Sequence, residues 1–182
     1  MLTYKKKPSI QKIMMNRIIQ FIIMNKECIN PEPFELMLKD FIKKNFNINN
    51  VSSDGYPLID IAIDKGNYIM VSLLIKYGAN VHTFNKAGWS PLHVAAAYGK
   101  FDIIKLLIDS GADVNIKNIH GNTPLHVASY CGHVNSIKCL FKLGADIHIK
   151  NCFFETSGDI AQRLNKLNCK KLLNKYESIS VY

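Results

Sequence analysis

"GWSPLHVAAAYGK" occupies residues 88–100, and "GNTPLHVASYCGH" occupies residues 121–133. The two stretches share Gly, a hydroxyl residue, Pro, Leu, His, Ala and a second Gly in the same order, thirty-three residues apart. A string that is repeated in this way builds either a catalytic site twice or one piece of architecture twice. The two interpretations lead to different functions, and the interval between the copies distinguishes them.

Small residues recur at the same interval through the middle of the chain. The recurring sets are Gly55, Gly88 and Gly121; Ala62, Ala95 and Ala128; Gly66, Gly99 and Gly132; and Gly78, Gly111 and Gly144. A fixed period of this length indicates a repeat array, in which each unit buries its apolar face only by stacking on its neighbours. The architectural interpretation therefore explains more of the sequence than a duplicated catalytic site.

Each unit carries local signals for a helix that begins and ends abruptly. Ser90 is expected to cap the first helix, because its hydroxyl can accept an amide hydrogen of the first turn. Pro91 fits the first helical position, where no amide donor is needed. His93 can complete the same turn by hydrogen bonds, and Gly99 can end the helix in a left-handed conformation. The counterparts in the next unit are Thr123, Pro124, His126 and Gly132.

A second helix is expected between Gly99 and Gly111, where five large aliphatic side chains form an apolar stripe. These are Ile103, Ile104, Leu106, Leu107 and Ile108. Gly111 and Gly144 are expected to end the second helices of the two units. The chain then runs out to a turn and returns to the next unit.

Taken together, "GWSPLHVAAAYGKFDIIKLLIDSGADVN" (residues 88–115) and "GNTPLHVASYCGHVNSIKCLFKLGADIH" (residues 121–148) closely resemble the ankyrin repeat family. The resemblance implies an all-α fold: a solenoid of stacked antiparallel helix pairs connected by β-hairpin-like loops. It also implies that the histidines and glycines above are structural.

The repeat period divides the chain into segments. We expect an N-terminal basic amphipathic helix or cap (1–33), a degenerate half repeat (34–51), a degenerate first repeat (52–84), a second repeat (85–117), a third repeat (118–150), and a C-terminal capping repeat with a tail (151–182). In the first repeat, Pro57 and Leu58 stand where later units have Ser/Thr and Pro, and Asp60 replaces the histidine. Terminal units of a stack expose one face and are expected to be atypical.

The N-terminal stretch "YKKKPSIQKIMMNRIIQFIIMNK" (residues 4–26) predicts an amphipathic helix that packs against the next element. Its apolar stripe is expected to consist of Ile10, Ile13, Met14, Ile18, Phe21 and Ile22. Lys12 and Arg17 interrupt the apolar run, so it resembles neither a signal peptide nor a transmembrane segment. The alternative is a helix that lies on a membrane surface.

The charge and cysteine content restrict the function class. The net charge is +9, yet only Arg17 and Arg163 among the 23 basic residues are arginines, which argues against specific nucleic-acid recognition. The five cysteines are odd in number and form no CxxC pair, which favours reduced thiols in an intracellular, cytoplasmic protein. No phosphate-binding glycine motif, metal-ligand spacing or catalytic constellation is present, so we predict no enzyme activity, no cofactor and no metal.

What remains is a binding surface. In the ankyrin family the loop tips and the outward positions of the first helices line a concave groove where partners bind. The resemblance places the following residues there: Tyr56, Phe84, Lys86, Trp89, Tyr98, Lys117, Ile119, His120, Asn122, Tyr130 and Lys150. Aromatic side chains suit such a surface because they bury much area at a small entropic cost. Lys86, Lys117 and Lys150 are expected to add a basic edge with one lysine per repeat interval.

The sequence therefore predicts a non-enzymatic module that binds another protein, one with an acidic or mixed surface. Two alternatives stay open. The chain could be a host-directed effector or inhibitor of a host signalling protein, acting in the host cytoplasm. It could also be a peripheral membrane adaptor that binds lipid through its basic N-terminal helix. Neither alternative is distinguished by the residues alone.

Overall fold

The fold is known from a computed structural model, which describes residues 9–25 and 30–179. Lys5, Lys6, Lys7, Lys26 and Cys28, which contribute to the expected basic N-terminus and to the cysteine pattern, lie outside the described residues. Over the described ranges the chain forms ten α-helices and no strand, so the predicted all-α class is confirmed. The chain divides into two compact units, residues 1–79 and residues 80–182.

The first unit contains four helices: α1 (Ile10–Met24), α2 (Glu32–Lys43), α3 (Leu58–Asp64) and α4 (Tyr68–Lys76). Helix α1 packs against both α2 and α3, and α3 packs against α4. The N-terminal helix therefore belongs to the packed body of this unit. Its side chains Met14, Met15, Ile18 and Ile22 are buried, and the ring of Phe21 stacks on that of Phe34 at a centroid distance of 5.3 Å.

The apolar stripe predicted for α1 was wrong at its N-terminal end. Ile10 and Ile13 are 69% and 47% exposed, whereas Met15, which was not in the predicted stripe, is buried. The reason is angular: a helix advances by about 100° per residue. The buried face of the helix is centred between Met14 and Met15, and Ile13 lies on the opposite side of the helix. A count of apolar residues at three- and four-residue spacing does not distinguish these two sides.

A carboxylate connects α2 to the end of α4. Glu35 Oε1 accepts hydrogen bonds from Tyr77 Oη at 2.7 Å and from Lys76 Nζ at 2.9 Å, and Lys39 Nζ lies 3.3 Å away. Hydrogen bonds from Lys76, Tyr77 and Lys39 lower the pKa of Glu35 to about 2. The carboxylate is therefore ionised under nearly all conditions in which the protein folds.

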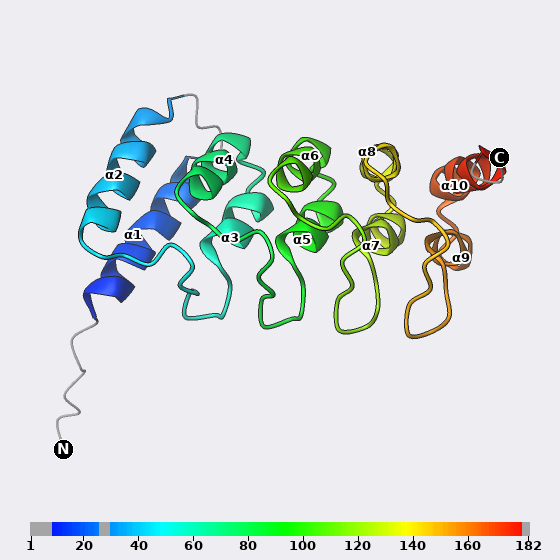
Figure 1. The fold of residues 1–182 in the computed structure, drawn as a ribbon, viewed down its shortest axis with the longest axis horizontal. Coiled ribbons are helices and arrows are strands. Elements are labelled where there is room, and N and C mark those ends of the chain that lie inside the picture. The colour runs from blue at the N-terminus through cyan, green and yellow to red at the C-terminus, as the bar shows by residue number, and fades with distance from the viewer. Residues whose placement is uncertain (1–8, 26–29, 180–182) are drawn as a thin grey trace, which may run out of the picture. The chain divides into compact units, whose positions relative to one another are not determined.

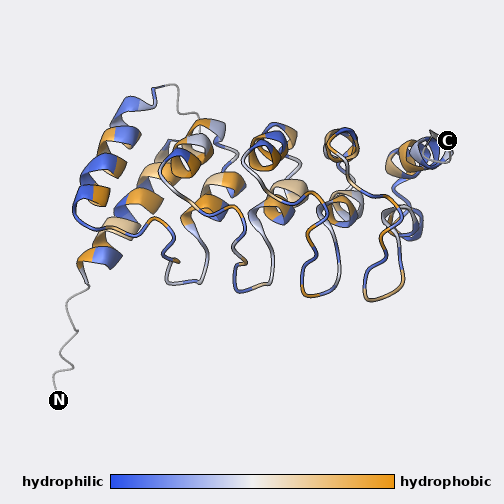
Figure 2. Cartoon of the chain, viewed as in Figure 1, coloured by the Kyte–Doolittle hydropathy of each residue, from blue (hydrophilic) through white to orange (hydrophobic). Residues whose placement is uncertain are grey.

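The second unit contains three antiparallel helix pairs. They are α5 (Pro91–Ala97) with α6 (Phe101–Asp109), α7 (Pro124–Cys131) with α8 (Val134–Lys142), and α9 (Ser157–Arg163) with α10 (Leu167–Ile179). The first helices α5, α7 and α9 pack in succession in one layer, and the second helices α6, α8 and α10 pack in another (Figure 1). The second helices α6, α8 and α10 carry both hydrophobic and hydrophilic residues (Figure 2), whereas α5 consists almost wholly of apolar, buried residues.

The core of the second unit lies between these two layers. Leu92, Leu125, Ile103, Leu107 and Leu140 are fully buried. Where the first helices meet, the side chains are small: Ala95 and Ala128 are also fully buried, which lets successive helices approach closely. The strict thirty-three-residue spacing of Ala95 and Ala128 reflects this requirement for close packing.

The caps of the first helices differ along the chain. Helix α3 begins after Pro57 without a side-chain cap, in keeping with the degenerate sequence of that repeat. Helix α9 begins with a capping box in which Thr156 Oγ1 accepts from the Asp159 amide at 3.2 Å and Asp159 Oδ2 accepts from the Thr156 amide at 2.9 Å. Asp159 thus occupies the position that a histidine holds in α5 and α7. Asn165, with φ of 54°, replaces the glycine that follows those helices.

Candidate partner-binding surface

Three loops of the second unit lie side by side below the first helices (Figure 1). We call them the first, second and third loops: residues 80–90, 113–123 and 146–156. Each is closed by a buried asparagine, respectively Asn85, Asn118 and Asn151. The Oδ1 atom of Asn85 accepts from the amides of Ala87 and Trp89 at 3.0 and 3.1 Å, and the other two asparagines bond in the same pattern. These asparagines were missed from the sequence, although their thirty-three-residue spacing was a usable signal.

Each buried histidine joins its own helix cap to the following loop. His93 Nδ1 accepts from the Ser90 hydroxyl at 2.8 Å and from the Ser90 amide at 3.3 Å. The ring proton therefore lies on Nε2, which donates to the Asn122 carbonyl at 2.8 Å. His126 repeats the arrangement with Thr123 at 2.8 Å and the Glu155 carbonyl at 3.0 Å.

The electrostatics of these histidines suit a structural role. Burial lowers the pKa of His93 to about 4, although the hydrogen bond to the Asn122 carbonyl opposes the shift. Burial also lowers the pKa of His126 below its ordinary value. Each histidine accepts from the neighbouring hydroxyl, but Ser90, His93, Thr123 and His126 are all buried, so a substrate has no access to either pair.

Most of the apolar residues predicted for the surface are exposed. Phe84 and Tyr98 are each 50% exposed, Tyr130 is 59% exposed and Ile119 is 68% exposed. Trp89 is half-buried instead, with its ring centroid 6.4 Å from that of His93. Tyr56 is 36% exposed and belongs to the first unit.

The basic edge is less regular than predicted. Lys86, Lys117 and Lys150 are all exposed. An offset of thirty-three residues, however, aligns Lys117 and Lys150 with Phe84, and it aligns Lys86 with Ile119. Only two of the three lysines therefore occupy equivalent positions, and Lys86 stands two residues further along its loop.

The predicted residues His120 and Asn122 help to tie the second loop to the third. The carbonyl of His120 accepts from the Cys152 amide at 3.0 Å, and Asn122 Oδ1 accepts from Asn151 Nδ2 at 2.9 Å. Ile119 lies against the backbone of the first loop at Gly88. The loops are therefore held to one another as well as to the helices.

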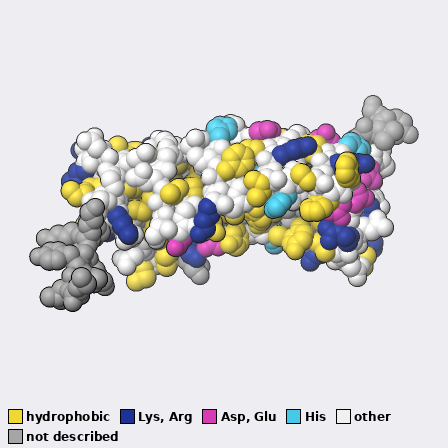
Figure 3. All heavy atoms as spheres, turned by 90° about the horizontal axis from the view of Figure 1, so that it is seen from below, with side chains coloured by type: hydrophobic (Ala, Val, Ile, Leu, Met, Phe, Trp, Pro, Cys, Tyr) yellow, Lys and Arg dark blue, Asp and Glu magenta, His cyan; other side chains and the backbone are white. Residues whose placement is uncertain are grey.

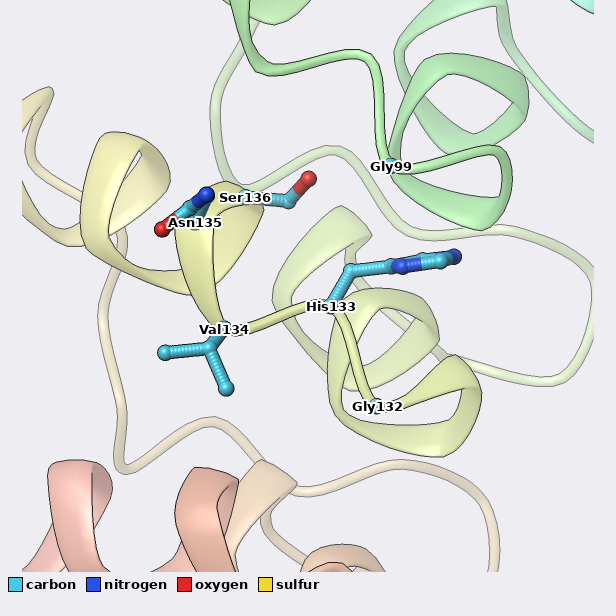
Figure 4. Close-up of a pocket in the computed structure, with 6 residues that line it drawn as sticks. All are labelled: Gly99, Gly132, His133, Val134, Asn135 and Ser136. Atoms are coloured by element: carbon cyan, nitrogen blue, oxygen red, sulfur yellow. The ribbon is translucent and has the colours of Figure 1, made fainter.

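The face that contains the loops is mixed in character. Figure 3 shows hydrophobic side chains beside lysine and arginine side chains toward the C-terminal end of this face. A separate pocket of about 220 Å³ lies at the other end of the helix pairs, between the turn at Gly99 and the start of α8 (Figure 4). His133 crosses it and its Nε2 lies 2.9 Å from the Ala97 carbonyl. No residue predicted to bind a partner lines this pocket.

Two kinds of feature are absent from residues 9–25 and 30–179. In these ranges no group of three or more His, Cys, Asp and Glu side chains is arranged to hold a metal ion. No helix among them combines the length and apolar character that crossing a bilayer requires.

Comparison with known proteins agrees with this architecture. The family model described as ankyrin repeats (3 copies) matches residues 18–118 and again residues 85–151. No curated protein matches the chain. The two family matches together run from α1 to the third loop, well over half of the sequence, and both compact units share in them. The chain belongs to the ankyrin repeat family.

Proposed function

We propose that the chain is a non-enzymatic binding module that holds an acidic partner protein against the loops and first helices of residues 80–182. Ankyrin repeats are in general protein–protein interaction modules. The observation that carries the finer proposal is the exposure of Phe84, Tyr98, Ile119 and Tyr130, each at least half exposed, on this part of the chain. Exposed aromatic and aliphatic side chains of this kind are typical anchors of interfaces.

The rigidity of the loops supports the same proposal. A surface that is already ordered loses little conformational entropy when a partner binds. The first loop is held by the Asn85 side chain, and the second and third are also joined through His93 and His126. The exposed side chains are therefore presented from a backbone that binding does not need to order.

The charge of the surface favours an acidic partner. Lys117 and Lys150 are exposed at equivalent positions of the second and third loops. The carboxylate of Glu155 is bound by Arg163 at 2.6 and 3.1 Å, and those of Asp113 and Asp146 accept from backbone amides at the starts of the same two loops. Carboxylates of a partner would be attracted to these lysines, mainly through faster association at low salt.

The test begins with co-purification of partners from the native cell with the full chain. A recovered protein is then titrated with purified variants by isothermal titration calorimetry. Tyr98→Ala with Tyr130→Ala should weaken binding by about tenfold or more. Phe101→Ala, an equally exposed aromatic on α6, is the matched control and should leave binding unchanged. Full affinity in the Tyr98/Tyr130 variant, with an unchanged melting temperature, would refute the proposed surface. A recovered partner that is encoded by a host organism would support the host-directed alternative, and a partner from the organism that makes the chain would not.

One observation favours a membrane adaptor as a second candidate. Ile10, Ile13, Ile23 and Met24 of α1 are between 46% and 83% exposed, beside the exposed Arg17. Apolar and cationic residues on one helix face are typical of binding to anionic lipid. Sedimentation with phosphatidylserine vesicles tests it, because Ile13→Asn with Met24→Asn should abolish binding. Equal sedimentation of this variant and the unchanged chain would exclude α1 as the lipid-binding element.

A further inference from the structure

Phe154, in the third loop, has a backbone conformation that its residue type rarely adopts. Its φ is 60°, in the left-handed region, where its counterparts in earlier units are glycines: Gly55, Gly88 and Gly121, with φ of 82°, 72° and 70°. The other described non-glycine residues with positive φ, Asn45 and Asn165, are asparagines, which tolerate that region well. A bulky aromatic residue there is a strained exception, and such exceptions are typical of functional positions.

The glycines in the earlier loops are required by the loop that follows them. A Cβ on Gly88 would lie 2.5 Å from Cγ2 of Ile119 in the second loop. A Cβ on Gly121 would lie 3.0 Å from the amide nitrogen of Cys152 in the third loop. Within the described residues no further loop lies against Phe154, whose side chain is 81% exposed. Phe154 therefore stands on the face of the third loop that neighbouring loops cover elsewhere.

The backbone beside Phe154 also has an unused acceptor. In the second loop, the carbonyl of His120 accepts from the Cys152 amide at 3.0 Å. Phe153 is the counterpart of His120, and no donor in the described part of the chain reaches its carbonyl. Its side chain is 70% exposed. Two exposed phenylalanines and a free carbonyl thus lie together on one edge of the third loop.

The four charged groups beside this edge balance one another, so the preference for an acidic segment comes from the charge of the chain as a whole. Lys150 is exposed on the same loop and lies near the ionised Asp159, which is turned into its own helix cap, while the Glu155 carboxylate is bound by Arg163. A second copy of this chain, with its net charge of +9, would be repelled in general. An acidic segment would be attracted.

We propose that the outer edge of the third loop, Cys152–Phe154, binds an extended acidic segment of a partner protein. The segment lies against Phe154 as the second loop lies against Gly88 and the third against Gly121. An amide of the segment donates to the Phe153 carbonyl, an apolar side chain packs on Phe154, and a carboxylate approaches Lys150. This inference rests on the proposed binding function and names the place and chemistry of one contact.

The experiment uses a phage-displayed library of peptides of about ten residues, selected on the full chain. The selected peptides should be rich in Asp and Glu around an apolar residue. Their affinities are then measured by fluorescence anisotropy for Phe154→Gly, for Lys150→Glu and for the control Phe101→Ala. Phe154→Gly should weaken binding by about tenfold or more, Lys150→Glu should weaken it further at low salt, and Phe101→Ala should not change it.

The Phe154→Gly variant also separates binding from folding. Glycine adopts a positive φ freely, so this variant should melt at the same temperature as the unchanged chain or above it. A loss of binding in a protein that is no less stable cannot come from misfolding. A lower melting temperature would show that Phe154 serves the fold and would overturn the proposal.

Other results of these experiments also test the proposed binding edge. No enriched peptide, or peptides that bind the Phe154→Gly variant with full affinity, would overturn this inference. If those peptides instead lose affinity for the Tyr98/Tyr130 variant, the proposed function stands and only the edge is wrong. Self-association or sedimentation with phosphatidylserine vesicles that Phe154→Gly abolishes would assign the edge to a second copy or to lipid, and would equally overturn it.

Discussion

The Nε2 atom of His93 lies 2.8 Å from the carbonyl oxygen of Asn122, so a buried imidazole in one repeat holds the loop of the next. The ring as a whole requires the neutral form, because Nδ1 accepts from the amide and hydroxyl of Ser90 and a proton on Nδ1 would break both bonds. The burial that protects the bond also lowers the pKa of His93 to about 4. Protonation and folding are therefore coupled at this residue.

The first prediction is that acid destabilises the second unit before most carboxylates titrate. In the unfolded chain, His93 binds a proton as the pH falls below its ordinary pKa of 6.5, whereas in the folded chain it stays neutral until about pH 4. Stability is thus fully present above pH 6.5 and is lost as the pH falls toward 4, by on the order of 3 kcal/mol. Urea unfolding at several pH values measures the loss. His93→Gln should flatten this slope, while His148→Gln, an exposed control, should not alter it.

Glu35 gives a second pH dependence, in the first unit and at lower pH. Its folded pKa of about 2 lies below the ordinary 4.5, so its contribution is present above pH 4.5 and is lost as the pH falls through that range. Glu35→Gln should lower the melting temperature at pH 7 and reduce the loss below pH 4.5. Asp40→Asn, which removes an exposed ion pair with Lys44, is the comparison and should have less effect. Equal shifts in the two variants would contradict a special role for Glu35.

Glycines with positive φ should differ in their tolerance of a methyl group. At Gly144, with φ of 92°, an added Cβ meets nothing within 4 Å, so Gly144→Ala should cost only the backbone strain, about 1 kcal/mol. At Gly121, with φ of 70°, the same Cβ would lie 3.0 Å from the backbone of Cys152, so Gly121→Ala should cost clearly more. Chemical denaturation of both variants gives the difference. Equal costs would mean that the third loop moves aside freely.

Ser136 should be a site where a smaller side chain stabilises the protein. It is fully buried in α8, its hydroxyl has no hydrogen-bond partner within the described residues, and its counterpart in α6 is Ile103. Ser136→Ala removes an unsatisfied hydroxyl and should stabilise the fold by about 1 kcal/mol. Ser90→Ala makes the same chemical change where the hydroxyl caps α5, so it should destabilise by about 1 kcal/mol. The same sign for both in denaturation experiments would be inconsistent with these contacts.

The sequence predicted the elements that are repeated and failed where a unit departs from the repeat. Ser90, Pro91 and Gly99 carry local chemistry that determines where a helix begins and ends, so the helix pairs followed from spacing alone. Whether Trp89 is exposed depends on its contact with His93, which spacing does not specify. The partner-binding residues proposed from the sequence still await a binding measurement.

Phe154 is a feature whose importance the sequence alone does not indicate. Its alignment with Gly55, Gly88 and Gly121 is visible in the sequence, but terminal units of a stack are expected to be atypical, so the substitution alone does not indicate a function. Only the retained left-handed backbone, with φ of 60°, shows that the loop keeps the glycine conformation without the glycine. A sequence pattern gives the residue type at a position, but the backbone conformation there also depends on the surrounding structure.

The histidine bonds make dependence between repeats one-directional. His126 Nε2 reaches forward to the Glu155 carbonyl, whereas the Asp159 carboxylate bonds within its own turn and, among the described residues, contacts no later loop. Truncation before residue 155 would remove that carbonyl and leave the ring nitrogen of His126 without a protein acceptor. Removal of α5 and α6 would take His93 away and leave the Asn122 carbonyl without its donor. A cut on the C-terminal side should therefore leave an unpaired donor in the remaining piece, and a cut on the N-terminal side an unpaired acceptor.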